Sequence, residues 1–527
     1  MLSLGDMLAQ EAAQRPRDLA LVHHQRGVRF TYADFWDNVQ KAARGLAGLG
    51  IGSGDRVVLW ADNQPAWLKA QYALASLGAV WVPADPAAGA DDLVYLLNHS
   101  EAKALILGEG FSRHLDDWSG HAALAEALAK LTCLVSLGRG GGRPPAIAWS
   151  EVLAGRGPEL PPPGSVSPDE VTAVIYTSGT TGAPKGVMVS HAGLMAKTKA
   201  AAERLGLTPA DRLALFCPLF HMFGNTCIAL AGFLSGAALV IPSDNFQPGP
   251  VLDALEAERC SAIFGTPSMF LALLDHPDYP RRALGRLRTG IIGGAQAPLE
   301  LMKRLTGEMG ARDLAIGYGQ TEACSWISLT GPEDPLELRV SSVGRPLPGA
   351  EVKVVDPAGW ESLPPGRVGE ICARGSLMVG YYAMPEVTAR TIDREGWLHT
   401  GDLGVLDEKG YLSIKGRLKE VIAREGGSVF PAQVEEVLYS LEGVSEAQVF
   451  GAARPDGQEL VLAWLRPRPG ANLDLAQVAA HCRGHLPPDQ QPDRFKLVES
   501  FPTTRSGKVQ KFRLRELAEA ELAAEAG

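Results

Sequence analysis

Short apolar runs alternate with amphipathic stretches from Arg56 to roughly Ala315. The apolar runs predict buried strands at 56–60, 79–83, 103–107, 171–176, 238–242, 261–264 and 288–292. Amphipathic spacing predicts helices at 67–78 and 91–100, the first of them ended by Gly78. Strands that alternate with helices are typical of a mostly parallel sheet covered by helices, so we expect an α/β fold.

Two changes of pattern divide the chain further. A Gly/Pro-rich stretch, 138–145 and 157–168, predicts a surface loop between two subdomains. Past Ser342, short strands at 350–356, 369–374 and 411–416 alternate with turn sequences and predict a small antiparallel unit. Beyond Lys419 we expect helices at 432–440 and 475–485, strands at 447–450 and 460–465, and a charged helical tail. We therefore expect a large domain, 1–418, and a small mobile α+β domain, 419–527.

Composition narrows the function classes. Of the 527 residues, 46% are hydrophobic and 21% charged, the balance of a soluble globular protein. A net charge of -10 gives no support to a nucleic-acid surface. The seven cysteines are scattered singly, without CxxC or zinc spacing, which favours reduced thiols. The sequence shows neither a secretory signal nor an apolar run of the roughly 18 residues that would span a membrane, so we expect a cytoplasmic protein.

The densest candidate for chemistry is YTSGTTGAPKGVMVSH, residues 176–191, which follows a predicted strand and precedes a predicted helix. Its glycines, Gly179, Gly182 and Gly186, let the backbone approach a ligand closely. Three hydroxyls and one cation lie among them: Ser178, Thr180, Thr181 and Lys185. Backbone N–H groups, hydroxyls and a lysine together suit a polyphosphate. The alternative is a plain Gly/Thr hairpin, and the loop is no Walker A motif because GxxxxGK[ST] does not occur.

This loop resembles the signature of the adenylate-forming superfamily, which holds acyl- and aryl-CoA synthetases, adenylation domains of peptide synthetases and beetle luciferases. Further motifs match in the family's order, from about Phe30 to Arg515. The resemblance implies that the loop binds the phosphates of ATP through Thr177, Ser178, Gly179, Thr180, Thr181, Gly182 and Lys185.

GYGQTE (317–322) resembles the family's adenine and metal motif. By that resemblance Tyr318 and Gly319 belong to the nucleotide site, Tyr318 stacks on adenine, Thr321 touches the α-phosphate, and Glu322 holds Mg2+. Upstream, a turn that resembles the wall of the adenine and substrate pocket contains Gly293, Gly294 and Ala295.

Three later matches complete the nucleotide site. WLHTGDLG (397–404) implies that Asp402 binds both ribose hydroxyls, which a carboxylate can do by accepting two hydrogen bonds. GRLKEVIAREGGSVFP (416–431) resembles the hinge between the domains; it implies that Arg417 contacts the ribose and that the backbone rotates at Lys419. In the same stretch Gly426 and Gly427 are expected beside the coenzyme A channel. PTTRSGKVQKFRLRE (502–516) implies that Lys508 is the mobile catalytic lysine.

LFCPLFHMFG (215–224) resembles the wall of the carboxylate pocket in acyl- and aryl-CoA synthetases. We expect an acyl pocket formed by His221, Phe223, Gly319 and Trp326. Relatives specialised for acetate carry Trp at the position of Gly319, so glycine there implies a larger acid: a medium or longer fatty acid, or an aryl or alicyclic acid. No Asp lies between Leu213 and Leu234, which counts against an amino-acid substrate.

The resemblance thus implies an ATP-dependent, AMP-forming ligase of fatty acid metabolism that uses Mg2+ and coenzyme A. The expected catalytic residues are Lys508, Glu322, Thr321, His221 and Lys185. One alternative is a ligase that loads a separate acyl-carrier protein. A luciferase-like oxidase is disfavoured by Ala423, where luciferases carry a lysine, and a non-catalytic nucleotide-binding module by the presence of Lys508 and Glu322.

Overall fold

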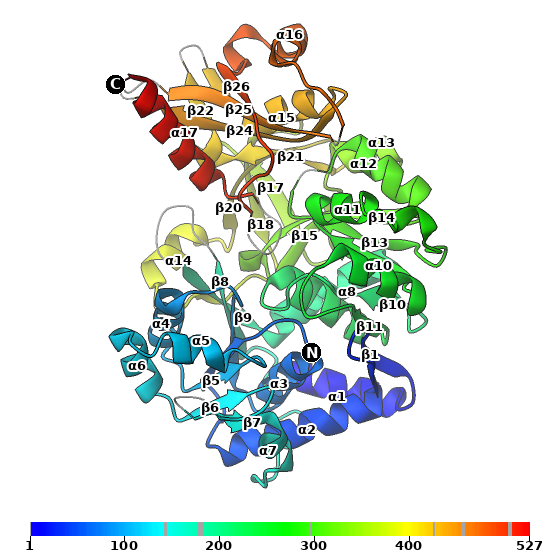
Figure 1. The fold of residues 1–527 in the computed structure, drawn as a ribbon, viewed down its shortest axis with the longest axis vertical. Helices are drawn as coiled ribbons and strands as arrows, with labels where there is room; N and C mark the ends of the chain where they lie inside the picture. The colour runs from blue at the N-terminus through cyan, green and yellow to red at the C-terminus, as the bar shows by residue number, and fades with distance from the viewer. Residues whose placement is uncertain are drawn as a thin grey trace.

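The computed structural model describes residues 2–141, 145–177, 184–295, 297–424, 427–454, 459–468, 470–503 and 509–526. The molecule is elongated, with the N-terminal segments (blue) towards one end and the segment beyond about residue 430 (orange and red) at the other (Figure 1). Two large sheets and a smaller one make up the chain before that segment. The predicted α/β class is confirmed.

The first large sheet has eight strands in the order β19-β9-β8-β4-β3-β5-β6-β7. The strands predicted at 56–60, 79–83, 103–107 and 171–176 are confirmed within it. Parallel pairing runs from β8 to β7, and β9 and β19 join antiparallel. The strands are β3 (Arg56–Trp60), β4 (Val80–Ala84), β5 (Ala104–Leu107), β6 (Cys133–Ser136), β7 (Ile147–Ala148), β8 (Val171–Thr177), β9 (Lys185–Ser190) and β19 (Gly380–Tyr381).

The second large sheet has nine strands in the order β16-β15-β14-β13-β12-β10-β11-β1-β2, parallel from β14 to β1. The strands predicted at 238–242, 261–264 and 288–292 lie in it. The strands are β1 (Leu19–His23), β2 (Val28–Thr31), β10 (Arg212–Ala214), β11 (Ala238–Ile241), β12 (Ala262–Gly265), β13 (Thr289–Gly293), β14 (Asp313–Gln320), β15 (Ser325–Leu329) and β16 (Arg345–Pro346).

One continuous core joins the two large sheets. It takes Val57 and Leu59 from β3 and Leu213 from β10, together with residues of α1, α2, α3 and α8. The alternate β3 residues Val58 and Trp60 pack on the other face, against α4 and α6. This alternation follows from the strand period of two.

Most helices of this part cover the two sheets. α3 begins on a proline, which suits the first helical turn, and ends before Gly78 at φ +68°. The helices are α1 (Leu4–Gln14), α2 (Tyr32–Gly48), α3 (Pro65–Ser76), α4 (Ala90–His99), α5 (Ser112–Asp117), α6 (Ala122–Ala129), α7 (Trp149–Ala154), α8 (His191–Arg204), α9 (Ala231–Leu234), α10 (Pro248–Ala257), α11 (Pro267–Leu274), α12 (Leu299–Lys303), α13 (Leu336–Ser341) and α14 (Pro385–Thr391). Short 3-10 turns are η2 (Tyr279–Arg281) and η4 (Thr321–Ala323), and π-helical turns are η1 (Phe223–Leu230) and η3 (Arg304–Glu308).

One prediction about the first sheet was wrong. The stretches 138–145 and 157–168 do not separate subdomains, because β6 before them, β7 between them and β8 after them belong to the same eight-stranded sheet. The helix predicted after the stretch 176–191 is confirmed, because α8 begins at His191. The strand β9 within this stretch was not predicted; it pairs antiparallel with β8, with Thr177 opposite Lys185. Residues 178–183 themselves lie outside the described residues.

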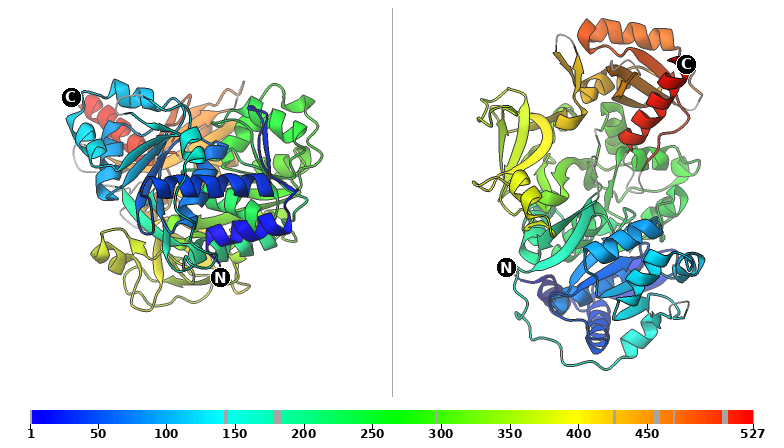
Figure 2. Two further views of the ribbon diagram at one scale, coloured as in Figure 1. Left: turned by 90° about the horizontal axis from the view of Figure 1, so that it is seen from below. Right: turned by 90° about the vertical axis from the view of Figure 1, so that its left-hand side faces the viewer.

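The predicted antiparallel unit is confirmed as a four-stranded sheet in the order β17-β18-β20-β21, with strands β17 (Glu351–Val355), β18 (Gly369–Arg374), β20 (Leu398–Leu406) and β21 (Leu412–Arg417). It lies between the large sheets and the C-terminal segment (Figures 1 and 2).

The C-terminal segment has its own packing. It follows η5 (Leu418–Glu420), and two hydrophobic clusters within it consist of residues from Ile422 to Leu522. Its elements are β22 (Ile422–Arg424), β23 (Gly427–Val429), α15 (Pro431–Tyr439), β24 (Val444–Ala453), β25 (Glu459–Pro467), α16 (Leu475–His485), η6 (Pro488–Gln490), β26 (Arg494–Leu497) and α17 (Lys511–Ala526). None of the described helices is long and apolar enough to cross a membrane.

His191, the first residue of α8, joins that helix to the N-terminal helix. Its Nδ1 accepts the Leu4 N–H at 3.1 Å, and burial lowers the pKa of the imidazole from 6.5 to about 4, against a smaller opposite effect of Asp6. Between pH 4 and pH 6.5 the imidazole of the unfolded chain binds a proton that the folded chain excludes. The contribution of neutral His191 to the free energy of unfolding is therefore fully present above pH 6.5 and is lost as the pH falls towards about 4. The difference corresponds to about 3 kcal/mol.

We therefore expect urea unfolding of the wild type to lose stability between pH 7 and pH 4.5. His191→Gln, which keeps an acceptor for Leu4 but does not titrate, should lose about 2–3 kcal/mol less over this range. His114→Gln, at an exposed histidine, serves as the control. Identical pH dependence in the wild type and His191→Gln would contradict the assignment.

Candidate functional site

The predicted adenine and ribose residues meet in the structure. Tyr318, near the end of β14, donates its hydroxyl to Asp402 Oδ2 at 2.7 Å. Arg417 Nε lies 3.2 Å from Asp402 Oδ1, because β20 and β21 pair with Asp402 opposite Arg417. Asp402 is 6% exposed, and burial, with a further effect of the Asp402 charge, raises the pKa of Tyr318 well above its ordinary value. The Asp402 carboxylate therefore contacts both the Tyr318 hydroxyl and the Arg417 guanidinium.

The predicted metal residue and the loop lysine meet at a tyrosine that the sequence did not single out. Tyr381 donates its hydroxyl to Glu322 Oε1 at 2.9 Å, and Lys185 Nζ lies 5.0 Å from the centre of the same ring. Burial, together with Glu322, raises the pKa of Tyr381. The contact arises because β19 pairs with β9, with Tyr381 opposite Val187. The Glu322 carboxylate and the Lys185 ammonium group thus both contact Tyr381.

A strained turn presents Glu322. Directly after η4, Cys324 has φ +58° and Ser325 φ +137°, conformations that are rare for residues other than glycine. The fully buried Lys197 of α8 donates to the Ala323 carbonyl at 3.1 Å and so holds the turn from beneath. Burial lowers the pKa of Lys197 to about 8. The sequence showed Lys197 only as one polar position in a helix and did not predict this contact.

The carboxyl ends of β13 and β14 lie side by side, with Gly293 opposite Gly317. Ligands of open α/β sheets bind at such ends. Gly294, at φ +84°, and Ala295 follow β13 at the surface. Thr321 follows β14 and is 8% exposed. Gly294, Ala295, Tyr318 and Thr321 therefore lie at the carboxyl ends of two neighbouring strands, and Asp402 of the four-stranded sheet contacts Tyr318 there.

Two aromatic residues predicted to line the acyl pocket are in contact. Phe223 and Trp326 pack edge to face with ring centres 5.6 Å apart. The Trp326 indole lies over two glycines: a Cβ added to Gly317 would come within 2.7 Å of it, and one added to Gly293 within 3.4 Å. Gly319 has a further structural reason to lack a side chain, because its Cβ would lie 2.0 Å from the Ser325 carbonyl oxygen. Its effect on pocket size stays a prediction.

His221 begins a segment that buried amides hold in place. Its Nδ1 accepts the Phe223 N–H at 3.2 Å, at the start of the π-helical turn η1. Gln71 of α3 and Asn225 of η1 exchange two hydrogen bonds, of 3.1 and 2.9 Å, and both are 3% exposed. Single π-helical turns are frequent at functional sites. The half-buried His221 therefore directly precedes a segment that buried hydrogen bonds hold in place.

The remaining predicted residues fall into two groups. Lys419, the predicted hinge residue, lies in η5, and Gly427 begins β23. The others lie outside the described residues: Ser178, Gly179, Thr180, Thr181, Gly182, Gly426 and Lys508.

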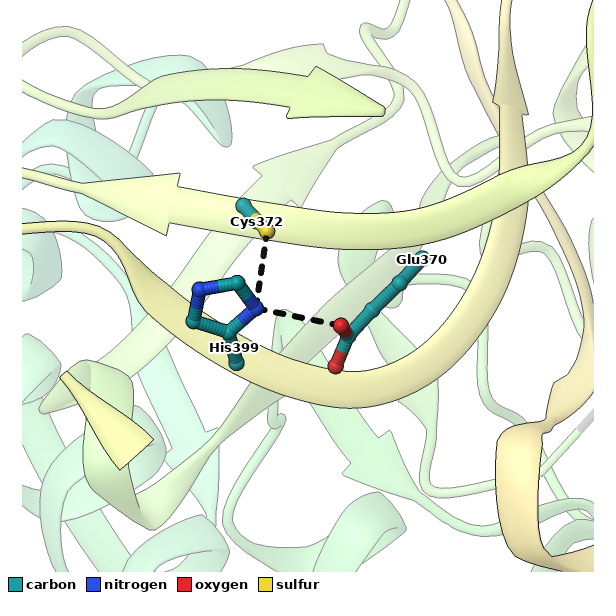
Figure 3. A group of neighbouring side chains, drawn as sticks. All are labelled: Glu370, Cys372 and His399. Atoms are coloured by element: carbon teal, nitrogen blue, oxygen red, sulfur yellow. Dashed lines mark hydrogen bonds and ion pairs between the residues drawn. The ribbon is translucent and has the colours of Figure 1, made fainter. Parts of the chain in front are cut away.

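A buried cluster beside Asp402 was not predicted. In Figure 3, His399 lies between Cys372 and Glu370, and both side chains point to its Nδ1, at 3.5 and 3.1 Å. Burial, with the Glu370 charge, raises the pKa of the Cys372 thiol to about 12. Ligand atoms of the three residues lie within 4.8 Å of one another, as in a metal site. Both Glu370 oxygens already have partners, His399 and the Gly401 N–H, which favours a hydrogen-bonded cluster.

Comparison with known proteins identifies the family of the chain. The family model of the AMP-binding enzymes matches residues 8–382, and that of their C-terminal domain matches residues 433–508. The acyl-CoA synthetase YngI, so named in Bacillus subtilis (strain 168), is 38% identical over 98% of this chain and 96% of its own. The mitochondrial medium-chain acyl-CoA ligase ACSF2 of Rattus norvegicus is 32% identical over 99% of this chain and 88% of its own.

Among solved structures, ATP-bound MatB from Rhodopseudomonas palustris superposes with a TM-score of 0.87 at 27% identity, over 99% of this chain and 100% of its own. The fold, the gathered motif residues and a family model that spans most of the chain lead to one conclusion: the chain belongs to the AMP-binding enzymes, the adenylate-forming superfamily that its motifs resemble.

Proposed function

We propose that this protein is an AMP-forming acyl-CoA synthetase for a medium-chain or longer fatty acid, or for an aryl or alicyclic acid. It activates the acid with ATP as an acyl-adenylate and transfers the acyl group to coenzyme A. The observation that carries the proposal is the contact of Tyr318, near the end of β14, with Asp402, which also pairs with Arg417 of the four-stranded sheet. The medium-chain assignment draws on the name of the ACSF2 relative, which matches over nearly the whole chain.

In the first half-reaction an oxygen of the substrate carboxylate attacks the α-phosphorus of ATP, and the bond to pyrophosphate breaks. Thr321, the phosphate loop with Lys185, and Lys508 would bind the phosphoryl oxygens where negative charge grows. Fixed donors of this kind usually give the largest catalytic contribution. Glu322 is half-buried, and its carboxylate and the Thr321 hydroxyl are hard oxygen donors that fit Mg2+. When bound, the ion would neutralise charge on the phosphates.

In the second half-reaction a thiolate attacks the acyl carbon, the bond to the adenylate oxygen breaks, and AMP leaves. We propose that residues 419–527 form a mobile domain that turns about Lys419 between the two steps. The hydrophobic clusters built from residues 422–522 support a body that packs on its own. Its turn would withdraw Lys508 and bring Gly426 and Gly427 beside the thiol. His221 would line the meeting point of acid and thiol.

Trp326 should set the length of the acid, because its indole fills the space above Gly293 and Gly317. We expect Trp326→Leu to favour longer acids. If about two further methylenes are buried at about 0.8 kcal/mol each, kcat/KM for the longer acid relative to the shorter should rise roughly tenfold. Trp149→Leu, at another buried tryptophan with an unpartnered indole N–H, is the matched control. If the chain-length profile of Trp326→Leu equals that of the wild type, Trp326 does not line the acyl pocket.

The function itself is tested by measuring AMP and acyl-thioester formation from ATP and Mg2+ across acids from acetate to long-chain and aryl, with and without coenzyme A. We expect coenzyme A-dependent thioester, with a maximum above acetate. Adenylate and pyrophosphate without any coenzyme A thioester would contradict the proposed acceptor and favour loading of a carrier protein.

A further inference from the structure

The turn that presents Asp402 is a bulge in the four-stranded sheet. β18 and β20 pair with Glu370 opposite Leu403 and Cys372 opposite His399. Between these pairs β18 has one residue, 371, whereas β20 has three, 400–402. Bulges re-aim side chains next to functional sites. Here the bulge directs Asp402 towards Tyr318 and Arg417, on neighbouring elements.

Side chains replace the strand partner that the bulge removes. The Gly401 N–H donates to Glu370 Oε1 at 2.9 Å, and Gly401 has φ +71°. The Thr400 hydroxyl donates to the Ile371 carbonyl at 2.6 Å and accepts the Asp402 N–H at 3.1 Å. Glu370 therefore holds the residue directly before Asp402.

Glu370 is itself fixed on its other side. It is 3% exposed, and its Oε2 lies 3.1 Å from His399 Nδ1 (Figure 3). His399 Nε2 lies 3.6 Å from Asp393, and the Trp360 ring packs edge-on against the imidazole with ring centres 4.4 Å apart. A buried carboxylate is costly unless its oxygens are hydrogen-bonded, and here both are. These contacts leave the carboxylate one orientation, with Oε1 towards Gly401.

We propose that Glu370 is a positioning residue for nucleotide binding: it holds the 400–402 bulge so that the Asp402 carboxylate faces the two ribose hydroxyls. The ligand class is a ribonucleotide with free 2′ and 3′ hydroxyls. The inference rests on the proposed role of Asp402 and adds the group that orients it. Glu370 touches neither nucleotide nor acid and acts through the Gly401 backbone.

The test compares adenylate formation with ATP and with 2′,3′-dideoxy-ATP, because only a correctly oriented Asp402 can accept hydrogen bonds from the ribose hydroxyls. The readout is the ratio of kcat/KM for the two nucleotides. Hydrogen bonds to a charged group are worth about 1.5–3 kcal/mol, so Asp402→Ala should lower the ratio roughly 10- to 100-fold. Glu370→Met, which keeps the length and removes both acceptors, should lower it about tenfold, whereas Glu370→Gln keeps an acceptor for Gly401 and restores most of it.

Cys372→Ala is the matched control, because it touches His399 in the same cluster but not the bulge. We expect its ratio to equal that of the wild type even if its melting temperature falls. In the Asp402→Ala background, Glu370→Met should change the ratio no further. Should Glu370→Met fail to fold, Thr400→Val removes the other side-chain contacts of the bulge at a half-buried position and should also lower the ratio.

The outcomes separate the two assignments. If Asp402→Ala keeps the wild-type ratio, the proposed role of Asp402 fails. If Asp402→Ala lowers the ratio but folded Glu370→Met keeps it, Asp402 stands and the inference about Glu370 is wrong. An unchanged ratio in Thr400→Val would likewise overturn the importance of the bulge.

Discussion

Replacing Lys508 by alanine should slow adenylate formation about 10²- to 10³-fold, because loss of one fixed donor to a developing negative charge costs about 3–4 kcal/mol. The residue lies outside the described residues, and its role follows from the motif at 502–516. The measurement is single-turnover pyrophosphate release from ATP and the acid. Thioester formation from preformed acyl-adenylate should keep near wild-type rates, since the proposed turn of residues 419–527 would withdraw the lysine in that step.

Lys496→Ala is the control for this variant. Lys496 lies in the same C-terminal segment and pairs with Glu521 at the surface, so its loss should leave both half-reactions intact. Equal loss of both half-reactions in Lys508→Ala, or wild-type pyrophosphate release, would contradict the assignment of the lysine.

Glu322→Gln should lower the rate of adenylate formation by about 10²-fold at ordinary Mg2+ concentration and raise the Mg2+ concentration needed for half-maximal rate. The reason is that the amide removes the negative charge that a hard divalent cation prefers. The measurement is pyrophosphate release as a function of Mg2+. Because Glu322 would hold the ion and not the acid, KM for the acid should change little.

Tyr381→Phe is matched to Glu322→Gln. It removes the hydroxyl that donates to Glu322 but keeps the carboxylate, so we expect a loss of about tenfold, the lower end of what one hydrogen bond to a charged group contributes. An Mg2+ dependence in Glu322→Gln equal to that of the wild type would exclude Glu322 as the metal residue.

Strands and helices with a clear local signal could be predicted from the sequence almost to the residue. RVVLW is β3, GEICAR is β18, and the helix expected at 475–485 is α16. In each case an apolar or amphipathic run is bounded by turn or cap residues, so local sequence alone sets the ends. β9 escaped prediction because the Gly-rich loop before it and the helix after it dominate the local pattern.

Contacts that depend on long-range pairing could not be predicted. Tyr381 reaches Glu322 and Lys185 because a two-residue strand, β19, pairs with β9 nearly two hundred positions earlier. No periodicity marks so short a strand. The Glu370–Cys372–His399 cluster likewise needs the register of β18 against β20. One local signal was present: Glu370 lies between apolar residues near the start of the strand GEICAR, where burial requires partners.

In the proposed reaction the acid is activated by forming a bond to the α-phosphorus of ATP before the thiol attacks. This order of bond formation is measured with a substrate acid that carries ¹⁸O in both carboxylate oxygens. Coenzyme A is present, and the products are analysed by mass spectrometry. The mechanism places one labelled oxygen in AMP for each thioester formed, since the bridging oxygen leaves with the nucleotide. Unlabelled AMP, or label in orthophosphate formed together with ADP, would contradict this mechanism, because it would show that the acid does not pass through an acyl-adenylate.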